Sequence, residues 1–287
     1  MQKKYLTIDG KIDGFGAQLM AKMTGVAYCE RYGFTYIHTP FKSIGHNITP
    51  QTVETLEDFT GMRSGDALFG DINVDNLNIE SHKIIRDVVL SNAPDLYYTP
   101  HVRKLLRIKY YSSTKLKPAF FDENKINVCL HVRRGDVGVS LKNRYTENND
   151  YIEVIKKLQS YESMVFHVFS NGCKDEFDEF NQFDNVILHI NRDLTETFHA
   201  MVVADILVPA KSALSYCAAI LSTGLVLNDC MTPFFTARNE LQCKPLNAWQ
   251  GVSKAIESGN VLQLDSGKRQ TKPLNEYDET LDKGGHK

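Results

Sequence analysis

The sequence lacks an excess of basic residues. Its 287 residues include 33 Lys and Arg against 35 Asp and Glu, which gives a formal net charge of −2. A protein that neutralises many phosphates of a nucleic acid usually carries a clear positive surplus. The balance therefore argues against nucleic acid as the main partner, and any positive charge that matters must be local.

The cysteines lack the spacing of a metal site or a redox pair. The chain has six cysteines, with no CxxC pair and no His-rich zinc spacing beside them. Disulfide frameworks belong mainly to small secreted domains, and most of these cysteines lie in apolar runs. We expect reduced, structural thiols and no bound metal. The six are Cys29, Cys129, Cys173, Cys217, Cys230 and Cys243.

Long apolar runs are also missing. The first residues, MQKKYLTIDG, have no apolar core of a signal peptide, and no stretch approaches the roughly 20 apolar residues of a membrane span. We found no internal repeat and no low-complexity segment. With 42% hydrophobic and 24% charged residues the composition is globular. We expect a soluble, cytoplasmic protein of one large or two ordinary domains.

The second half of the chain alternates strands with helices. Helical spacing over Tyr151–Leu158, an N-cap at Asp193 with Glu196 three residues on, and Ser212 before Ala213–Leu221 mark three helices. Such alternation predicts βαβ units and a parallel sheet covered on both faces. The expected strands are Lys125–Val132, Ser163–Phe169, Asn185–Ile190, Asp205–Val208 and Leu225–Leu227.

The first half is less regular. We expect strands at Tyr5–Ile8 and Phe34–Ile37 around a helix from Ala17 to Tyr32, and a mainly helical pattern beyond Thr49. The clearest of the later helices are Gln51–Phe59 and Pro100–Tyr111. We predict a domain at 1–122, a second at 123–266, and a polar tail at 267–287 that lies outside the core or is disordered.

The sharpest motif is the HVRRGD segment, which follows the first strand of the second half. Arg133 and Arg134 leave a buried strand at its carboxyl end, where ligands bind in open α/β sheets. A guanidinium fork suits phosphate, Gly135 permits close backbone approach or a positive φ, and Asp136 can orient an arginine. The alternative is a surface turn in which Arg134 pairs with Asp136.

A second motif, KSALSY, follows a later strand and begins a helix. The unpaired amides of a first helical turn form a natural anion site. Ser212 and Ser215, one turn apart, can add hydroxyl donors to a phosphate. The alternative is that Ser212 only caps the helix, which leaves Ser215 unexplained.

Two weaker motifs complete the set. Asp13 precedes a GFG turn, Gly14 to Gly16, which lacks the third glycine of the dinucleotide fingerprint because position 19 is Leu19. An NAD-dependent oxidoreductase is therefore disfavoured. Asn171, in the FSNG segment at another strand end, can bond a base or ribose, although Asn-Gly is also an ordinary turn.

In this order, GFGAQL, HVRRGD, FSN and PAKSALSYCAA resemble the superfamily of α-1,2-, α-1,6- and protein O-fucosyltransferases. The resemblance runs from residue 14 to about residue 229, as short islands with unmatched sequence between them. It implies an α/β, GT-B-like fold of two Rossmann-like domains facing a cleft. It also implies inverting transfer of fucose from GDP-fucose to a glycan hydroxyl, without a metal.

The resemblance also implies roles for the motif residues. Arg133 would hold the β-phosphate and stabilise the departing GDP. The resemblance supplies no base, and from the residues themselves Asp136 is the first candidate to activate the acceptor and Asp13, beside the GFG turn, the second. His131 and Asn171 would lie near the ribose or guanine. The donor-binding set is His131, Arg133, Arg134, Asn171, Ser212, Ser215, Gly14 and Gly16.

The sequence departs from the family's pattern at two places. Tyr216-Cys217 stands where the α-1,2 enzymes have an aromatic pair, and Leu141 replaces the glutamate proposed as base in α-1,6 enzymes. Two alternatives therefore stay open. One is a transferase that uses another GDP- or UDP-sugar on the same scaffold, and the other is a non-catalytic module that binds a nucleotide sugar or a glycan.

Overall fold

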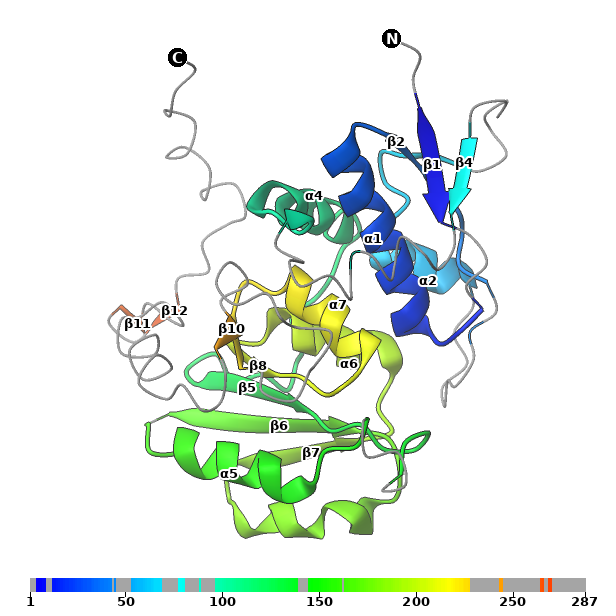
Figure 1. Cartoon of the computed structure of the whole chain (residues 1–287). Coiled ribbons are helices and arrows are strands. Elements are labelled where there is room, and N and C mark those ends of the chain that lie inside the picture. The colour runs from blue at the N-terminus through cyan, green and yellow to red at the C-terminus, as the bar shows by residue number, and fades with distance from the viewer. Residues whose placement is uncertain are drawn as a thin grey trace.

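The structure is a computed structural model in which most of the chain up to residue 227 is described. The described residues are 4–8, 12–42, 44, 53–68, 77–80, 88, 96–138, 144–161, 163–227, 243–244, 264–265 and 268–269. They contain a four-stranded and a six-stranded sheet, both parallel, with helices between and outside them (Figure 1). The expectation of an α/β fold with parallel sheets is confirmed.

The first sheet has the strand order β3-β2-β1-β4. The expected strands at Tyr5–Ile8 and near Phe34–Ile37 are confirmed as β1 and β2, and the helices as α1, α2 and α4. Beyond Thr49 the described elements are mainly helical, as expected, but two short strands at the sheet edges, which the sequence did not predict, lie among them. The elements are β1 (Tyr5–Ile8), α1 (Phe15–Tyr32), β2 (Thr35–His38), α2 (Val53–Thr60), β3 (Ala67–Leu68), β4 (Leu77–Glu80) and α4 (Pro100–Tyr110).

The second sheet has the order β10-β9-β8-β5-β6-β7. All five strands expected in this half are confirmed, and β10 is an additional edge strand. Counted from β5 along the chain, the order is 3-2-1-4-5-6, that of a doubly wound dinucleotide-binding fold. The strands are β5 (Ile126–His131), β6 (Met164–Ser170), β7 (Val186–Ile190), β8 (Ile206–Val208), β9 (Leu225–Leu227) and β10 (Cys243–Lys244).

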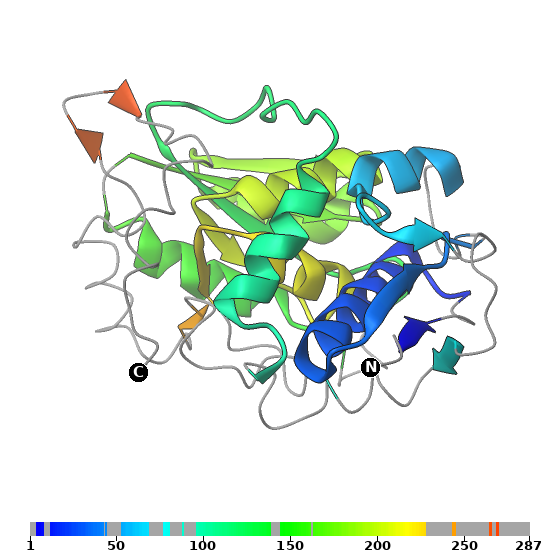
Figure 2. The ribbon, with the colours of Figure 1, turned by 90° about the horizontal axis from the view of Figure 1, so that it is seen from above.

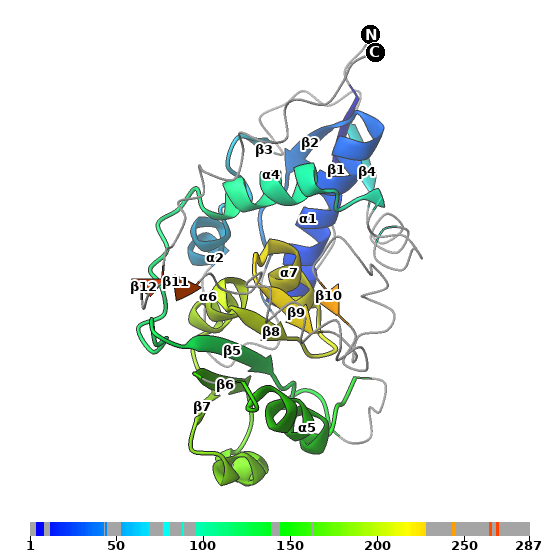
Figure 3. The ribbon, with the colours of Figure 1, turned by 90° about the vertical axis from the view of Figure 1, so that its left-hand side faces the viewer.

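Helices cover both faces of this sheet (Figure 3). On one face, α5 (Asn148–Leu158) and the 3-10 helix η2 (Lys174–Gln182) pack through Ile155 and Phe177 into one apolar cluster. On the other face lie α6 (Leu194–Val203) and α7 (Ala213–Leu221). Every residue of β5 and β6 is buried, as expected for central strands of a parallel sheet covered on both faces.

The two halves share one apolar cluster. It joins side chains of the first sheet, such as Leu6, to α1, α4, α6 and α7, and reaches the second sheet at Cys129. The contact of α1 with α7 is close, because a Cβ on Gly16 would lie 2.5 Å from the Leu214 amide nitrogen. From α4, Arg107 donates to the carbonyls of Leu221 and Ser222 at 2.9 and 2.6 Å, which satisfies the end of α7.

The helix starts follow the sequence signals. Asp193 accepts hydrogen bonds from the amides of Thr195 and Glu196, and Ser212 accepts from Leu214, so both expected N-caps are confirmed. None of the helices in the described residues has the length and apolar character that crossing a membrane requires. Of the predicted polar tail, only β12 (Lys268–Arg269), paired with β11 (Leu264–Asp265), is described.

Candidate functional site

The six-stranded sheet has a topological switch point between β5 and β8. From β5 the chain crosses to β6 on one side, and it later returns to β8 on the other side. The loops that leave β5 and β8 therefore diverge at the carboxyl edge, which is where open α/β sheets bind ligands. These two loops carry the HVRRGD and KSALS motifs, so the fold brings the two sharpest sequence signals together.

Arg133 is fixed across this switch point. Its Nε and Nη2 atoms donate to the carboxylate of Asp136 at 3.3 and 2.8 Å, and Nη1 donates to the carbonyl oxygen of Lys211 at 3.1 Å. The side chain is still 22% exposed. Because a guanidinium has five N–H groups and these three bonds use one each, one N–H remains on each terminal nitrogen. A held, reachable fork of this kind can bind a phosphate.

Arg134 is placed differently from its neighbour. Only 4% of it is exposed, its guanidinium lies 4.0 Å over the ring of Tyr145, and it donates to Asn148 Oδ1 at 2.5 Å and to the carbonyl of Arg133 at 2.9 Å. The alternative pairing of Arg134 with Asp136 is wrong, since Asp136 pairs with Arg133. Arg134 therefore anchors the loop, and its guanidinium contacts groups of the protein in the place where a ligand contact was expected.

His131 and Ser215 link the two loops beneath Arg133. His131 Nδ1 lies 2.5 Å from the hydroxyl of Ser215, which also accepts from the amide of Ala210 at 3.1 Å. Ser215 is fully buried. Burial and then the charge of Arg133 lower the pKa of His131 to about 4, against an opposing effect of Asp136. The imidazole is therefore neutral at pH 7, and Ser215 already has two partners inside the protein.

The start of α7 borders the same place. Ser212 is buried and caps the helix, as the alternative interpretation of the sequence held. The ammonium group of Lys211 donates to the carbonyl of Tyr145 at 3.1 Å, which joins the β8 loop to the segment that covers Arg134. The positive end of α7 therefore faces the carboxyl edge of the sheet beside Arg133.

Asn171 lies exposed at the end of β6, next to the HVRRGD loop. Gly135 has φ +78°, as expected for a glycine there, and a Cβ on it would meet Asn171 Cβ at 3.4 Å. Asn191, which follows β7, holds the backbone of Gly172 at both its amide and its carbonyl, at 3.0 and 2.9 Å. Asn191 was not predicted, although a polar residue directly after a strand was the available signal.

The GFG turn reaches the switch point from the first sheet. Gly16 packs against Leu214 at the start of α7, so its lack of a side chain serves helix packing. Asp13 is exposed, and its carbonyl accepts from Gln18 Nε2 at 2.8 Å. Gly14 is the N-cap of α1, in extended conformation. The structure thus brings this turn to the start of α7, which follows the β8 loop, and a donor-binding role for its glycines stays a prediction.

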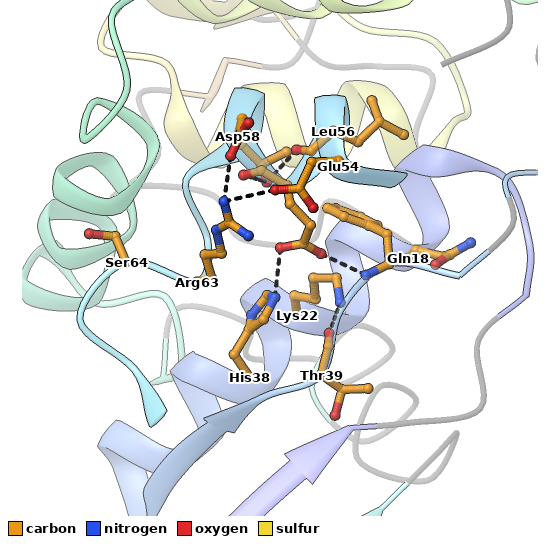
Figure 4. Close-up of polar contacts among 12 residues, drawn as sticks. Gln18, Lys22, His38, Thr39, Glu54, Leu56, Asp58, Arg63 and Ser64 are labelled. Atoms are coloured by element: carbon orange, nitrogen blue, oxygen red, sulfur yellow. Dashed lines mark hydrogen bonds and ion pairs between the residues drawn. The ribbon is translucent and has the colours of Figure 1, made fainter. Parts of the chain in front are cut away.

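A buried polar cluster that no sequence motif predicted lies in the first half (Figure 4). His38 Nε2 lies 2.8 Å from one oxygen of Glu57, and the amide of Phe41 donates to the other at 2.6 Å. The ammonium group of Lys22 donates to the carbonyl of Thr39. Burial raises the pKa of Glu57, but its hydrogen bonds and nearby positive charge outweigh burial and lower it. The cluster ties α1, β2 and α2 together.

Of Leu141 and the cysteines, the structure describes only some. Leu141, which replaces the family's glutamate, lies outside the described residues. Four of the cysteines, Cys29, Cys129, Cys173 and Cys217, are free thiols. Burial raises the pKa of Cys29 to about 12, with smaller effects of Glu30 and Asp66, so this thiol is inert.

Comparisons with known proteins give structural likenesses and no family. No protein-family model and no curated protein matches the sequence. Among solved structures, fucosyltransferase NodZ from Bradyrhizobium is 14% identical and covers 77% of this chain and 94% of its own, with a TM-score of 0.43. E. coli heptosyltransferase WaaC with ADP is 10% identical, covering 89% and 99%, with a TM-score of 0.42. A point mutant of Arabidopsis thaliana FUT1 in complex with GDP is 10% identical, covering 78% and 70%, with a TM-score of 0.39.

Proposed function

We propose that the protein is a glycosyltransferase that binds a nucleotide-diphosphate sugar at the switch point of its six-stranded sheet. The observation that carries the proposal is the fixed, reachable guanidinium of Arg133. Asp136 and the Lys211 carbonyl hold it between the loops that leave β5 and β8. This position and this chemistry together fit a diphosphate better than an uncharged ligand.

The reaction needs stabilisation of a leaving group. When the bond between sugar and phosphate breaks, negative charge grows on the diphosphate and oxocarbenium character grows on the sugar. The two remaining N–H groups of Arg133 and the positive end of α7 would stabilise the departing diphosphate. Both are in place before the reaction, so little reorganisation is needed when the charge develops. The proposed mechanism draws on no metal for this step.

We propose fucose as the transferred sugar and GDP-fucose as the donor because of the motif order, GFGAQL, HVRRGD, FSN and PAKSALSYCAA. In this proposal Asn171, exposed beside Gly135, contacts the ribose or base, and Ser212 lies near the phosphates. Ser215 and Arg134 act as positioning residues, because their polar atoms already bind within the protein. His131, whose ring is neutral, lies close enough to Arg133 for the arginine's charge to lower its pKa.

The geometry changes the order of the two candidate bases. Both oxygens of Asp136 bind Arg133, so this carboxylate positions the arginine. Asp13 is exposed at the turn after β1, and that turn packs on the start of α7. We therefore propose Asp13 as the first candidate to accept the proton of the acceptor hydroxyl, with inversion at the anomeric carbon.

The test is the release of GDP from GDP-fucose in the presence of a panel of glycan acceptors. We expect transfer by the wild type and a loss of at least about 10²-fold in Arg133→Ala, the cost of removing one donor that stabilises a leaving group. Wild-type turnover by a folded Arg133→Ala protein would refute the assignment. Binding of GDP-fucose with no transfer to any acceptor would favour the non-catalytic module. Turnover of another nucleotide sugar alone would move the proposal to that donor.

A further inference from the structure

A cavity lies beside the segment that joins α4 to β5, and none of its lining residues belongs to the loops after β5 and β8. It has a volume of about 420 Å³ and is open to solvent. Its walls are the segment 114–120, which leads from α4 to β5, the start of α6, and Phe59 at the end of α2. Figure 2 shows that segment as the long green loop leaving α4. The volume falls in the range of small-molecule sites.

The charges around this cavity are mainly positive. Lys115, Lys117 and Arg192 line it, with Glu196 as the single carboxylate among its lining residues. Burial lowers the pKa of Lys115 to about 8, so this ammonium group is still mainly charged at pH 7. Burial, with the charge of Lys115 second, lowers the pKa of His199 to about 4, so His199 is neutral. The lining therefore favours an anion.

Arg192 is held in place by a buried row of hydrogen bonds. Its Nη1 lies 2.9 Å from His189 Nδ1, His189 Nε2 lies 3.0 Å from His167 Nδ1, and His167 Nε2 lies 3.2 Å from Asn127 Oδ1. Since a guanidinium only donates, each histidine accepts at Nδ1 and donates from Nε2. Burial lowers the pKa of His189 to about 3 and that of His167 to about 4, which agrees with two neutral rings.

This arrangement leaves Arg192 able to bind a ligand. Its Nε donates to Glu196 at 2.8 Å, and its guanidinium lies 4.5 Å over the ring of Phe120. Two of its five N–H groups are used in these bonds, and the side chain is 38% exposed. A cation fixed before binding loses little freedom when a ligand arrives, which favours affinity.

The remaining lining suits a sugar ring. Phe59 and Phe120 provide half-buried aromatic walls. Within the described residues, the exposed Lys117 forms an ion pair with the solvent-exposed Glu123 at 3.2 Å. Thr195 and Glu196 add oxygen atoms that can accept hydrogen bonds from ring hydroxyls. An apolar wall with a few polar groups at its edge is the usual composition of a small-molecule site.

We propose that this cavity binds a sugar carrying an acidic group, a carboxylate or a phosphate, between Arg192 and Lys117. The acidic group would pair with the two cations, and the ring would lie against Phe120 with its hydroxyls toward Glu196 and Thr195. The cavity shares no residue with the site around Arg133. The proposal therefore goes beyond the donor chemistry and can be tested without it.

The test is titration of the full chain with glucuronate, glucose 6-phosphate and glucose, followed by ligand-observed NMR. We expect at least one acidic sugar to bind about tenfold more tightly than glucose. Lys117→Glu and Arg192→Gln should each weaken that binding about tenfold, since each removes a charge-assisted contact. Lys156→Gln, an exposed lysine on α5 at the opposite face of the sheet, is the matched control and should bind as the wild type does.

The results of this titration support or overturn the proposed acidic-sugar site as follows. A preference for glucuronate identifies a carboxylate ligand, and a preference for glucose 6-phosphate identifies a phosphate ligand. Equal binding of glucose, or no binding of either acid up to millimolar concentration, overturns the proposal. If Arg133→Ala abolishes the binding, the acid occupies the switch-point site, and the proposal is again overturned. Lys117→Glu, on the exposed segment, keeps the test valid if Arg192→Gln fails to fold.

Discussion

At the scale of single residues, the adjacent arginines of HVRRGD have different roles. Both follow the same buried strand, yet Arg133 reaches across to the β8 loop and stays partly exposed, whereas Arg134 is buried against Tyr145. A sequence pattern identifies two cations at a strand end but does not show which one turns inward. That choice depends on Asn148 and Tyr145, which follow the motif by about a dozen residues.

This difference predicts different effects of truncation. Arg134→Ala should lower the free energy of unfolding by about 2–3 kcal/mol, because it removes buried packing and leaves Asn148 without its partner. Arg133→Ala should change it by less than about 1 kcal/mol, because surface pairs contribute little. Urea denaturation of both variants measures the difference. Equal stabilities would show that the burial of Arg134 has no energetic consequence.

At the scale of secondary-structure elements, the contact of α1 with α7 depends on one glycine. A Cβ at Gly16 would lie 2.5 Å from the backbone nitrogen of Leu214 and 2.8 Å from its Cα, so one helix would have to move. We expect Gly16→Ala to cost about 1–3 kcal/mol in stability, the usual effect of overpacking.

The matched control is Gly138→Ala, where an added Cβ meets nothing within 4 Å. It should change the free energy of unfolding by no more than about 0.5 kcal/mol. If both variants unfold at the same denaturant concentration, then the close approach of α1 to α7 does not constrain the protein.

Much of the second half could be predicted at this scale, and less of the first. β5 and β6 are mainly apolar runs, and Asp193 and Ser212 are direct capping signals, so their elements follow from local sequence. β3 has only two residues and β4 four, and each pairs at an edge of the first sheet. Such short strands have too few residues for a periodic pattern, so only pairing with β1 and β2 defines them.

The candidate site could be predicted in outline. The HVRRGD and KSALS motifs identified the two loops. The strand order 3-2-1-4-5-6 of the six-stranded sheet then places both loops at one switch point. The partners within the site could not be predicted. Ser215 is turned inward to His131, and the carbonyl of Lys211 binds Arg133. Both contacts depend on the register of β8 beside β5, which no local pattern fixes.

At the scale of the whole molecule, buried neutral histidines make stability depend on pH. The pKa of His131, His167 and His199 is lowered to about 4 and that of His189 to about 3, each mainly by burial. In the unfolded chain they titrate near about 6.5. Between these values the unfolded state binds more protons, so the free energy of unfolding falls as the pH falls.

We expect a clear loss of stability from pH 7 to pH 5, with up to about 1.4 kcal/mol per pH unit for each histidine. Denaturation at several pH values measures it. His199→Asn, which removes one of these histidines, should reduce the slope. His101→Asn should not, because His101 is 75% exposed. A flat free energy of unfolding over this range would contradict the neutral, buried state of the four rings.

The central claim is that Arg133 holds a nucleoside diphosphate at the switch point between β5 and β8. Calorimetric titration of the wild type and of Arg133→Ala with GDP, GDP-fucose, UDP and NAD tests it most directly. We predict micromolar binding of GDP and GDP-fucose by the wild type and none by a folded Arg133→Ala protein. Binding of GDP that persists unchanged in the variant, or binding of NAD in place of GDP, would contradict it.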